Sequence, residues 1–417
     1  MNSLKTYKFS DLYQMSSGIS STPKQAGHGS PFLSFSAVFG NYFLPEKFDD
    51  LMQTSDLEQK KYSILEGDIF LTRTSETIDE LGMSSVAVKN YPNATYSGFL
   101  KRLRPTQKNV TYHKFMGFYL RSKLFRKTME NNAVLTLRAS LNEDIFSYLN
   151  LIIPEYNEQV KIGDLLYLLN QKIDLNNRIN FELEKMAKAI YDYWFVQFDF
   201  PDKNDKPYKS SGGKFFYDSG LKFKIPQDWT AKRILDLSPN STNTINPAVN
   251  PDKNFKHFSI PEFDKTGSYK IEKGKEIGSN KYAITGYDLL VSKLNPWFNR
   301  VIYPFHEEEL ICSTEFVVWR TDCDEIKNHL YLASTNTNFI NFCIKSATGT
   351  SNSHKRISPY VMMGYLLPFN EKVVLKFGKK IDPIIKKIFK NKKENQELQK
   401  LRDWLLPMLM NGQVKVN

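Results

Sequence analysis

The sequence has few cysteines and no long apolar run. Its three cysteines, Cys312, Cys323 and Cys343, are odd in number and fit neither a disulfide framework nor a CxxC zinc site. Nowhere do 18 apolar residues follow one another, and the first residues contain no apolar segment typical of a signal peptide. These absences favour a reducing compartment, and we expect a soluble cytoplasmic protein with no membrane partner.

Motifs for nucleotide and metal chemistry are also missing. The chain has no GxxxxGK phosphate loop and no Gly-rich strand-to-helix turn that could cradle a methionine cofactor. Its six histidines are scattered, and Pro251-Asp252 has no nearby ExK to complete a nuclease metal site. We therefore expect no catalytic residue, no metal ligand and no cofactor on this chain.

What the sequence does have is an excess of cations and of aromatic residues. Lys and Arg number 57 against 45 Asp and Glu, a formal charge of +12, and aromatics make up 14% of the chain. A hydrophobic fraction of 41% over 417 residues can support two or three folded domains. The charge favours a polyanionic partner, nucleic acid first, but an ordinary basic cytoplasmic protein fits it about as well.

The chain contains an internal repeat. Residues 161–194 align with residues 376–409 at a constant offset of 215. Weaker matches in the same order pair residues 67–73 with 286–293, 95–105 with 313–320, and the strand-like segments that end at Pro154 and Pro368. The identical pairs include Lys161 with Lys376, Gly163 with Gly378, Ile173 with Ile388, Asn176 with Asn391, Asn180 with Asn395 and Leu183 with Leu398.

This repeat predicts an α+β protein in which two α/β domains form a pseudo-twofold tandem repeat, separated by two long antiparallel coiled-coil helices. Each domain mixes short strands, such as Asp68 to Leu71 and Phe99 to Leu103, with one amphipathic helix, 112–129 in the first and 325–344 in the second. The expected boundaries are a variable domain at 1–154, a helix at 155–200, a polar linker at 201–224, a second variable domain at 225–368 and a second helix at 369–417.

The two long helices carry a narrow apolar stripe with spacings of three and four residues, which is typical of a coiled-coil seam. At about 1.5 Å per residue the first helix is roughly 50 Å long, so it acts as a spacer. Two asparagines interrupt the stripe at matching heights in each helix, and buried asparagines fix register, so we expect the helices to pack on each other. The alternative is two unrelated surface helices. The predicted seam consists of Ile173, Asn176, Asn180, Leu183, Ile388, Asn391, Asn395 and Leu398, and the stripe continues through Met186 and Leu401.

The end of the first helix is crowded with aromatic residues. Tyr191, Trp194 and Phe195, with Trp404 in the second helix, are candidates for a subunit-binding surface, because exposed aromatic clusters often form binding hot spots. The alternative, weighed about equally, is that some of them belong to the core of the adjoining domain.

Basic and hydroxyl side chains cluster in the loops and at the strand ends of both variable domains. Such donors suit phosphate oxygens, while Arg, Lys and Asn also bind base edges. The loop at 348–356 carries the sharpest signal, although lysine-rich faces are more often simply solvated. The candidate DNA-binding residues are Thr72, Arg73, Thr74, Lys101, Arg102, Arg104, Lys293, Asn295, Arg300, Thr350, Asn352, Ser353, Lys355 and Arg356.

The helices and their flanks resemble the specificity subunits of type I restriction-modification systems. The residues that carry the resemblance are Leu169 to Asn180 with Glu182-Leu183-Glu184, Ile190 to Phe195, Asn395 to Leu398 with Leu401 to Pro407, the Gly349-Thr350 loop, and Ile225 to Trp229. The resemblance implies two target-recognition domains that each read half of a bipartite double-stranded DNA target. It also implies two methyltransferase subunits docked on the helices and restriction subunits that join them, with S-adenosylmethionine, ATP and Mg bound by these partners. One departure is that residues 379–393 are rich in lysine.

Two other classes of protein remain open. A methyltransferase that modifies DNA by itself is suggested by Asn295-Pro296-Trp297-Phe298, which superficially resembles the Asn-Pro-Pro-aromatic motif, but Trp297 stands where the second proline belongs. A structural coiled-coil scaffold accounts for the helices but not for two large variable domains.

Overall fold

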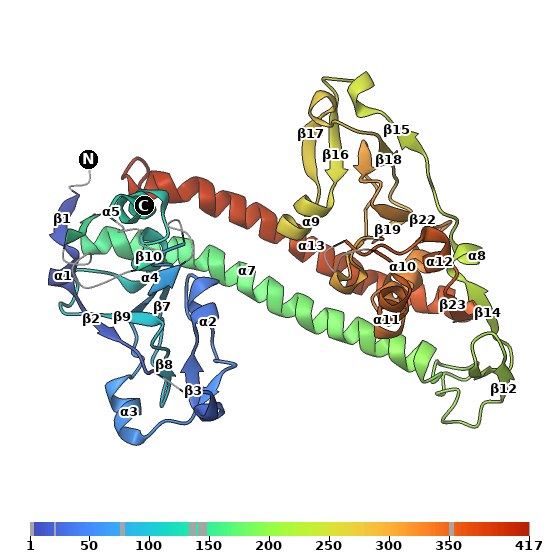
Figure 1. Ribbon diagram of the computed structural model, residues 1–417, viewed down its shortest axis with the longest axis horizontal. Coiled ribbons are helices and arrows are strands. Elements are labelled where there is room, and N and C mark those ends of the chain that lie inside the picture. Colours follow the sequence, from blue (N-terminus) through green and yellow to red (C-terminus); the bar gives the residue numbers. More distant parts are fainter. Residues whose placement is uncertain are drawn as a thin grey trace. The chain divides into compact units, whose positions relative to one another are not determined.

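The computed structural model describes residues 4–20, 22–75, 80–132, 139–140, 148–349 and 354–416. The chain divides into two units: unit 1 comprises residues 1–176 and 392–417, and unit 2 comprises residues 177–391. Both divisions fall inside the long helices α7 (Tyr156–Tyr191) and α13 (Glu371–Met410) (Figure 1). The divisions lie at Asn176 and Asn391, which the repeat pairs. Each unit therefore contains the first half of one long helix and the second half of the other.

Unit 1 is built from short strands and helices that precede α7. Its sheets have the strand orders β2-β9-β5-β7, β4-β3-β8, β1-β11 and β10-β6. In chain order the elements are β1 (Lys5–Lys8), α1 (Phe9–Leu12), β2 (Tyr13–Ser17), η1 (Pro23–Gln25), β3 (Ala26–Leu33), α2 (Phe35–Phe39), β4 (Leu51–Met52), α3 (Asp56–Lys61), β5 (Ile69–Thr72), β6 (Thr74–Ser75), β7 (Ser84–Val86), β8 (Thr95–Tyr96), β9 (Leu100–Pro105), α4 (His113–Tyr119), α5 (Lys123–Asn132), β10 (Ala139–Ser140) and β11 (Asn150–Ile153).

Unit 2 repeats this order between α7 and α13. Its sheets have the orders β20-β19-β22, β15-β18-β21-β16-β17, β14-β23 and β12-β13. The elements are a π-helical turn (Asp192–Val196), β12 (Phe215–Asp218), β13 (Phe223–Pro226), β14 (Thr230–Arg233), α8 (Ile234–Leu237), β15 (Thr244–Ile245), η3 (Pro247–Val249), β16 (Asn254–Phe258), α9 (Ile260–Thr266), β17 (Lys270–Lys273), η4 (Gly274–Glu276), β18 (Lys281–Ala283), β19 (Asp288–Ser292), η5 (Pro296–Phe298), β20 (Val301–Ile302), β21 (Leu310–Cys312), β22 (Phe316–Arg320), α10 (Asp324–Ser334), α11 (Thr337–Ser346), α12 (Pro359–Met363) and β23 (Leu366–Phe369).

The pairing of the strands confirms the repeat. In unit 1, β3 runs parallel to β8 and antiparallel to β4, and in unit 2 β16 runs parallel to β21 and antiparallel to β17. Strand β5 pairs with β9 and β7 in unit 1, as β19 pairs with β22 and β20 in unit 2. The two predicted domains therefore share one fold.

A glycine lets each long helix approach its own domain closely. A Cβ added to Gly163 of α7 would collide with the backbone of Phe115 in α4, and one added to Gly378 of α13 would overlap the backbone of Glu325 in α10. These two glycines are paired by the 215-residue offset. The glycine pair in the sequence therefore marks the same helix crossing in both units.

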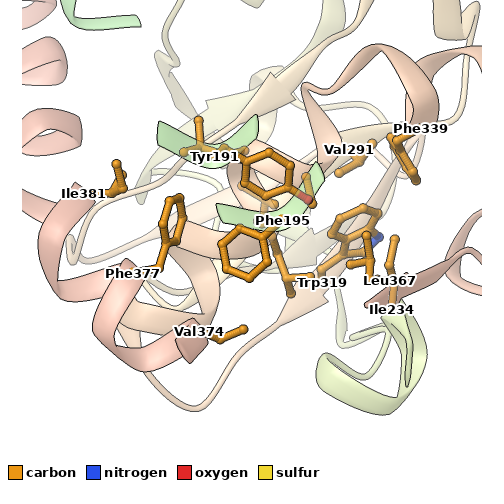
Figure 2. Packing of buried hydrophobic residues seen from close by; sticks show 14 of the residues in the cluster. Tyr191, Phe195, Ile234, Val291, Trp319, Phe339, Leu367, Val374, Phe377 and Ile381 are labelled. Atoms are coloured by element: carbon orange, nitrogen blue, oxygen red, sulfur yellow. The ribbon is translucent and has the colours of Figure 1, made fainter. Parts of the chain in front are cut away.

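Each unit buries an apolar core against the helices. In unit 1 the core includes Ile162 and Leu166 of α7 with Leu409 of α13. In unit 2 the core contains Tyr191 at the end of α7, Phe195 in the π-helical turn that follows, Phe377 of α13 and Trp319 of β22 (Figure 2). The rings of Phe195 and Phe377 meet edge to face, with centroids 4.9 Å apart.

The helices are antiparallel in both units, and the asparagines bond across the seam as predicted. In unit 1, Asn176 Nδ2 donates to Asn395 Oδ1 at 2.9 Å, and Asn395 Nδ2 donates to the carbonyl of Ile173 at 3.4 Å. In unit 2 the equivalent Asn391 Nδ2 donates to Asn180 Oδ1 at 2.9 Å, and Asn180 Nδ2 donates to the carbonyl of Ile388 at 3.2 Å. All four asparagines are buried, so the seam contains an equivalent set of buried asparagine hydrogen bonds in each unit.

Some details of the helices differ from the predictions. Met186 and Leu401 are 51% and 42% exposed, so the buried seam passes through Ala187 instead of Met186. The expected helix at 112–129 is two helices, α4 and α5, and the one at 325–344 is α10 and α11. Each break has a capping side chain: Ser122 Oγ accepts from the N–H of Phe125, and Asn336 Oδ1 accepts from that of Asn338.

The expected polar linker at 201–224 is instead a folded part of unit 2. The ring of Tyr208 stacks on Phe200 with centroids 4.8 Å apart. Strand β12 pairs with β13, and Phe215 packs against the core. Composition suggested a linker because the segment 202–213 is polar, but aromatic residues on either side of it anchor it.

We predict that Asn391→Ala lowers the free energy of unfolding by about 1–3 kcal/mol, because it leaves the buried amide oxygen of Asn180 without its donor. The double variant Asn180→Leu/Asn391→Leu removes both polar groups and should recover most of this loss. Urea denaturation measures the change. Asn341→Ala, on the exposed side of α11, is the matched control. Equal stability of the two alanine variants would contradict a stabilising role for the buried hydrogen bond between Asn391 and Asn180.

His329 makes the stability of unit 2 depend on pH. Burial lowers the pKa of His329 from 6.5 to about 3, and neither ring nitrogen has a hydrogen-bond partner among the described residues. The unfolded chain therefore binds a proton near pH 6.5 that the folded chain excludes. The resulting stability is present above pH 6.5 and is lost as pH falls toward 3.

We expect His329→Leu to flatten the fall in unfolding free energy between pH 6.5 and 4 relative to the unaltered chain. Denaturant titrations at a series of pH values measure it. His28→Leu, at an exposed position of unit 1, should leave the pH dependence unchanged, and equal pH profiles for all three proteins would contradict this role of His329.

Candidate nucleic-acid interface

Three backbone segments of unit 2 meet at one corner of its sheet. The N–H of Lys293, just after β19, donates to the carbonyl of Glu315, just before β22, at 3.0 Å. The loop that ends at Arg356 joins them, since Leu294 and Arg356 form an antiparallel bridge. The N–H of Ile357 also donates to the carbonyl of Lys293 at 3.0 Å. The described end of the predicted loop, residues 354–356, therefore lies beside the predicted residues at 293–295.

Side chains reinforce this corner. Asn295 adopts a left-handed conformation, with φ 50°, its N–H donates to the carbonyl of Lys355 at 2.8 Å, and its Oδ1 accepts from the N–H of Lys355 at 3.1 Å. Arg356 Nε donates to Glu315 Oε2 at 3.1 Å. Trp297 and Phe298, which follow Asn295, are 39% and 58% exposed.

Unit 1 has the same corner. The N–H of Arg73, just after β5, donates to the carbonyl of Phe99, just before β9, at 2.9 Å. Ser140 of β10 pairs with Thr74 of β6 as Arg356 pairs with Leu294. Position by position, Arg73, Phe99 and Ser140 thus correspond to Lys293, Glu315 and Arg356 of unit 2.

A buried ion pair fastens the opposite ends of these strands. Arg104 of β9 holds both carboxylate oxygens of Asp68 at 2.6–2.7 Å, and Arg320 of β22 holds those of Asp288 at 2.8 Å. Both aspartates are fully buried. The hydrogen bonds to the carboxylates raise the pKa of Arg104 and of Arg320.

The structure argues against five of the candidate DNA-binding residues. Thr72 is fully buried, and its hydroxyl accepts from the N–H of Met83. Lys101 and Arg102 are each 8% exposed and are held by the Ser17 hydroxyl and the Ser63 carbonyl. Arg104 is bound to Asp68. Arg300 forms two bonds with Asp264 and stacks on the ring of Phe298. Both faces of β9 are covered at Lys101 and Arg102, so these cations are buried on opposite sides of the strand, which a count of charges does not reveal.

The other candidates fall into two groups. Arg73 and Arg356 are exposed, and Lys293, Asn295 and Lys355 are half-buried at the corner. These five stay predicted DNA contacts. Outside the described residues are Thr350, Asn352 and Ser353, together with the side chain of Thr74.

The predicted subunit-binding cluster is mostly core. Tyr191, Trp194 and Phe195 are 5%, 4% and 3% exposed and pack inside unit 2, so the prediction of a surface site is wrong for them. Figure 2 shows Tyr191 and Phe195 in this core. The alternative, that they belong to the core of the adjoining domain, is correct for these three residues. Trp404 is 63% exposed and stays a candidate for contact with a partner.

Two residues of the corner escaped the sequence analysis, Phe99 and Glu315. Phe99 is 66% exposed, and Glu315 holds Arg356. The match between residues 95–105 and 313–320 places the two at the same position, which was the signal that could have found them. Neither is a cation or a hydroxyl or amide donor, the residue types that suit phosphate oxygens.

The described residues include no group of three or more His, Cys, Asp or Glu that could hold a metal ion. Within the same ranges, no helix has the length and apolar character needed to cross a membrane.

Comparison with known proteins identifies the class of this fold. Residues 37–185 match the family model described as type I restriction modification DNA specificity domain. The chain is 23% identical over 347 residues to the type I restriction enzyme MjaIX specificity subunit of Methanocaldococcus jannaschii, covering 79% of this chain and 75% of that protein. It is 25% identical over 335 residues to the HindI specificity subunit of Haemophilus influenzae, covering 65% of this chain and 70% of the relative.

A solved structure shows the same fold over the whole length. The S subunit of a type I restriction-modification system from M. genitalium superposes with a TM-score of 0.63 at 13% identity, covering 98% of this chain and 96% of that one. The family match and the repeated fold agree with the resemblance found in the helices. Residues 37–185 thus match a type I restriction modification DNA specificity domain, and the chain is similar to type I specificity subunits over most of its length.

We predict that Arg320→Met destabilises the protein by on the order of 3 kcal/mol, because it leaves the carboxylate of Asp288 buried without its countercharge. Arg104→Met should act in the same way on Asp68. Thermal and urea denaturation measure both. The control is Arg233→Met, which removes an exposed pair with Asp236 and should change little; a loss as large as that of Arg320→Met would count against the role of burial.

Proposed function

We propose that this chain is a non-catalytic, cytoplasmic reader of a bipartite double-stranded DNA target, with each half of the target bound by one unit. The observation that carries the proposal is that two units of one fold present different side chains at the same corner. One fold with two unlike surfaces suits the reading of two unlike half-sites. The excess of cations supplies the attraction to phosphate that any DNA reader needs.

The two long helices would set the distance between the half-sites. The buried asparagines support this role, because a shift in register would leave their amides unsatisfied. A fixed register is what a constant gap between two half-sites requires, as in dimeric DNA readers.

The chemistry would come from partners. We propose that two methyltransferase subunits and, for cleavage, restriction subunits assemble on this chain and carry S-adenosylmethionine, ATP and Mg. The exposed Trp404 of α13 is one candidate contact for them. A methyltransferase acting alone is the second candidate function, and the experiment below separates the two.

We expect the purified chain to transfer no methyl group to DNA, and the chain together with the methyltransferase subunit of the same host to methylate one bipartite sequence with a fixed gap. Sequencing that detects modified bases, on plasmid DNA incubated with S-adenosylmethionine, measures this. The methyltransferase subunit alone is the control. Methylation by the lone chain would reverse the assignment, and methylation by the complex without sequence preference would refute the reading role.

A further inference from the structure

One turn occurs in both units with a different residue at its tip. In unit 1 the N–H of Phe99 donates to Ser97 Oγ at 3.3 Å, and that of Leu100 to the carbonyl of Ser97 at 2.9 Å. In unit 2 the N–H of Glu315 donates to Ser313 Oγ at 3.2 Å, and that of Phe316 to the carbonyl of Ser313 at 3.1 Å. The turn is the same, so Phe99 and Glu315 leave the backbone from equivalent positions.

The partner strand holds each tip in the same way. The N–H of Arg73 donates to the carbonyl of Phe99, and the N–H of Lys293 donates to that of Glu315, at 2.9 and 3.0 Å. A cation thus stands beside both tips. Both units have a cation at this position, whereas the tip residue is a phenylalanine in unit 1 and a glutamate in unit 2. A contact that both units share is general, and one that differs between them can be selective for a base.

In unit 2 the carboxylate orients a guanidinium. Glu315 accepts from Nε of Arg356 at 3.1 Å and from Nη2 at 3.4 Å. The backbone of Arg356 is fixed as well, since it exchanges two hydrogen bonds with Thr348 at 2.8 and 2.9 Å. The Arg356 side chain is nevertheless 49% exposed. With its Nε edge bound to Glu315, the N–H groups of Nη1 and one of Nη2 have no acceptor among the residues that the structure describes and can donate to a ligand.

These tips suit different bases. An arginine that is held in place offers two parallel donors to O6 and N7 of guanine, the commonest specific contact in the major groove. A phenylalanine offers neither donor nor acceptor, and its ring, 66% exposed in Phe99, fits the methyl group of thymine. Burying an exposed ring against that methyl group also removes apolar surface from water.

We propose that Arg356, positioned by Glu315, reads a guanine in the half-site of unit 2, and that Phe99 reads a thymine in the half-site of unit 1. This inference rests on the proposed function and adds the residues that determine its specificity. Arg73 and Lys293 bind phosphate at the same corner and do not discriminate between bases.

The test uses the full chain with the methyltransferase subunit of its host and a library of DNA duplexes randomised over both half-sites. Selection of bound duplexes followed by sequencing gives the base preference at every position. For Arg356→Ala we expect the preference for guanine at one position of one half-site to fall about tenfold or more, and the other half-site to stay unchanged. Arg356→Lys, which keeps the charge but loses the paired donors, should lose the same preference.

Two further variants complete the test. Phe99→Ala should relax a thymine in the other half-site only. Glu315→Gln should weaken the same guanine position as Arg356→Ala, a readout that a merely structural role of Glu315 would not move. Lys232→Ala, an exposed cation of β14, and Leu57→Ala, an exposed apolar residue of α3, are the matched controls and should leave both half-sites unchanged.

The outcomes separate the two proposals. If the unaltered complex selects no bipartite sequence, the proposed function fails. If the unaltered complex selects a bipartite sequence but the Arg356 and Phe99 variants keep every base preference, only the inference about these two residues fails. Weaker binding to all sequences alike would show phosphate contact only, and it would also overturn base reading by these residues.

Discussion

Four asparagine side chains in the helix seam decide how the two long helices meet in each unit. Each amide is removed from water, and its donor is satisfied by an asparagine or a carbonyl of the opposite helix. An apolar seam would tolerate a slip by one turn, because leucine and isoleucine pack in many registers. A buried amide does not, since a slip would leave it without a partner. Stability is given up here in exchange for a defined alignment.

The remaining fold attaches to this seam through contacts that occur once in each unit. A glycine admits α4 or α10 against the long helix, and a buried aspartate–arginine pair joins the ends of two neighbouring strands. These contacts fix the backbone of the sheet at one end. The corner at the other end is held in both units by equivalent main-chain hydrogen bonds, so the residue at its tip can differ while the backbone stays the same. This difference between the two ends of the sheet explains how one fold can have two unlike surfaces.

The internal repeat in the sequence predicted the parts of the fold that occur twice. The offset of 215 residues identified the long helices, the asparagine seam and the equivalence of the two domains, because these depend on residue identity and spacing. It did not predict the breaks at Ser122 and Asn336, since a capping side chain interrupts an otherwise continuous apolar pattern.

The candidate site was predicted less well than the fold. Basic residues on β9 were taken for DNA contacts, but Lys101 and Arg102 turn inward to bind Ser17 and Ser63. Lys327 shows the same difficulty, because its ammonium group is fully buried and donates to the carbonyls of Gly286 and Pro304. Whether a cation faces solvent depends on tertiary neighbours, which a single sequence does not display.

The composition of the two units also bears on how the chain comes to be folded. Unit 2 is one continuous stretch, residues 177–391, whereas unit 1 needs residues 392–417 to complete its core around Leu409. During synthesis from the N-terminus, the first domain emerges early but lacks residues 392–417 until unit 2 has been made. Ile162 and Leu166 of α7, which share a core with Leu409, therefore lack this partner while unit 2 is being made, and in that interval a chaperone can bind them.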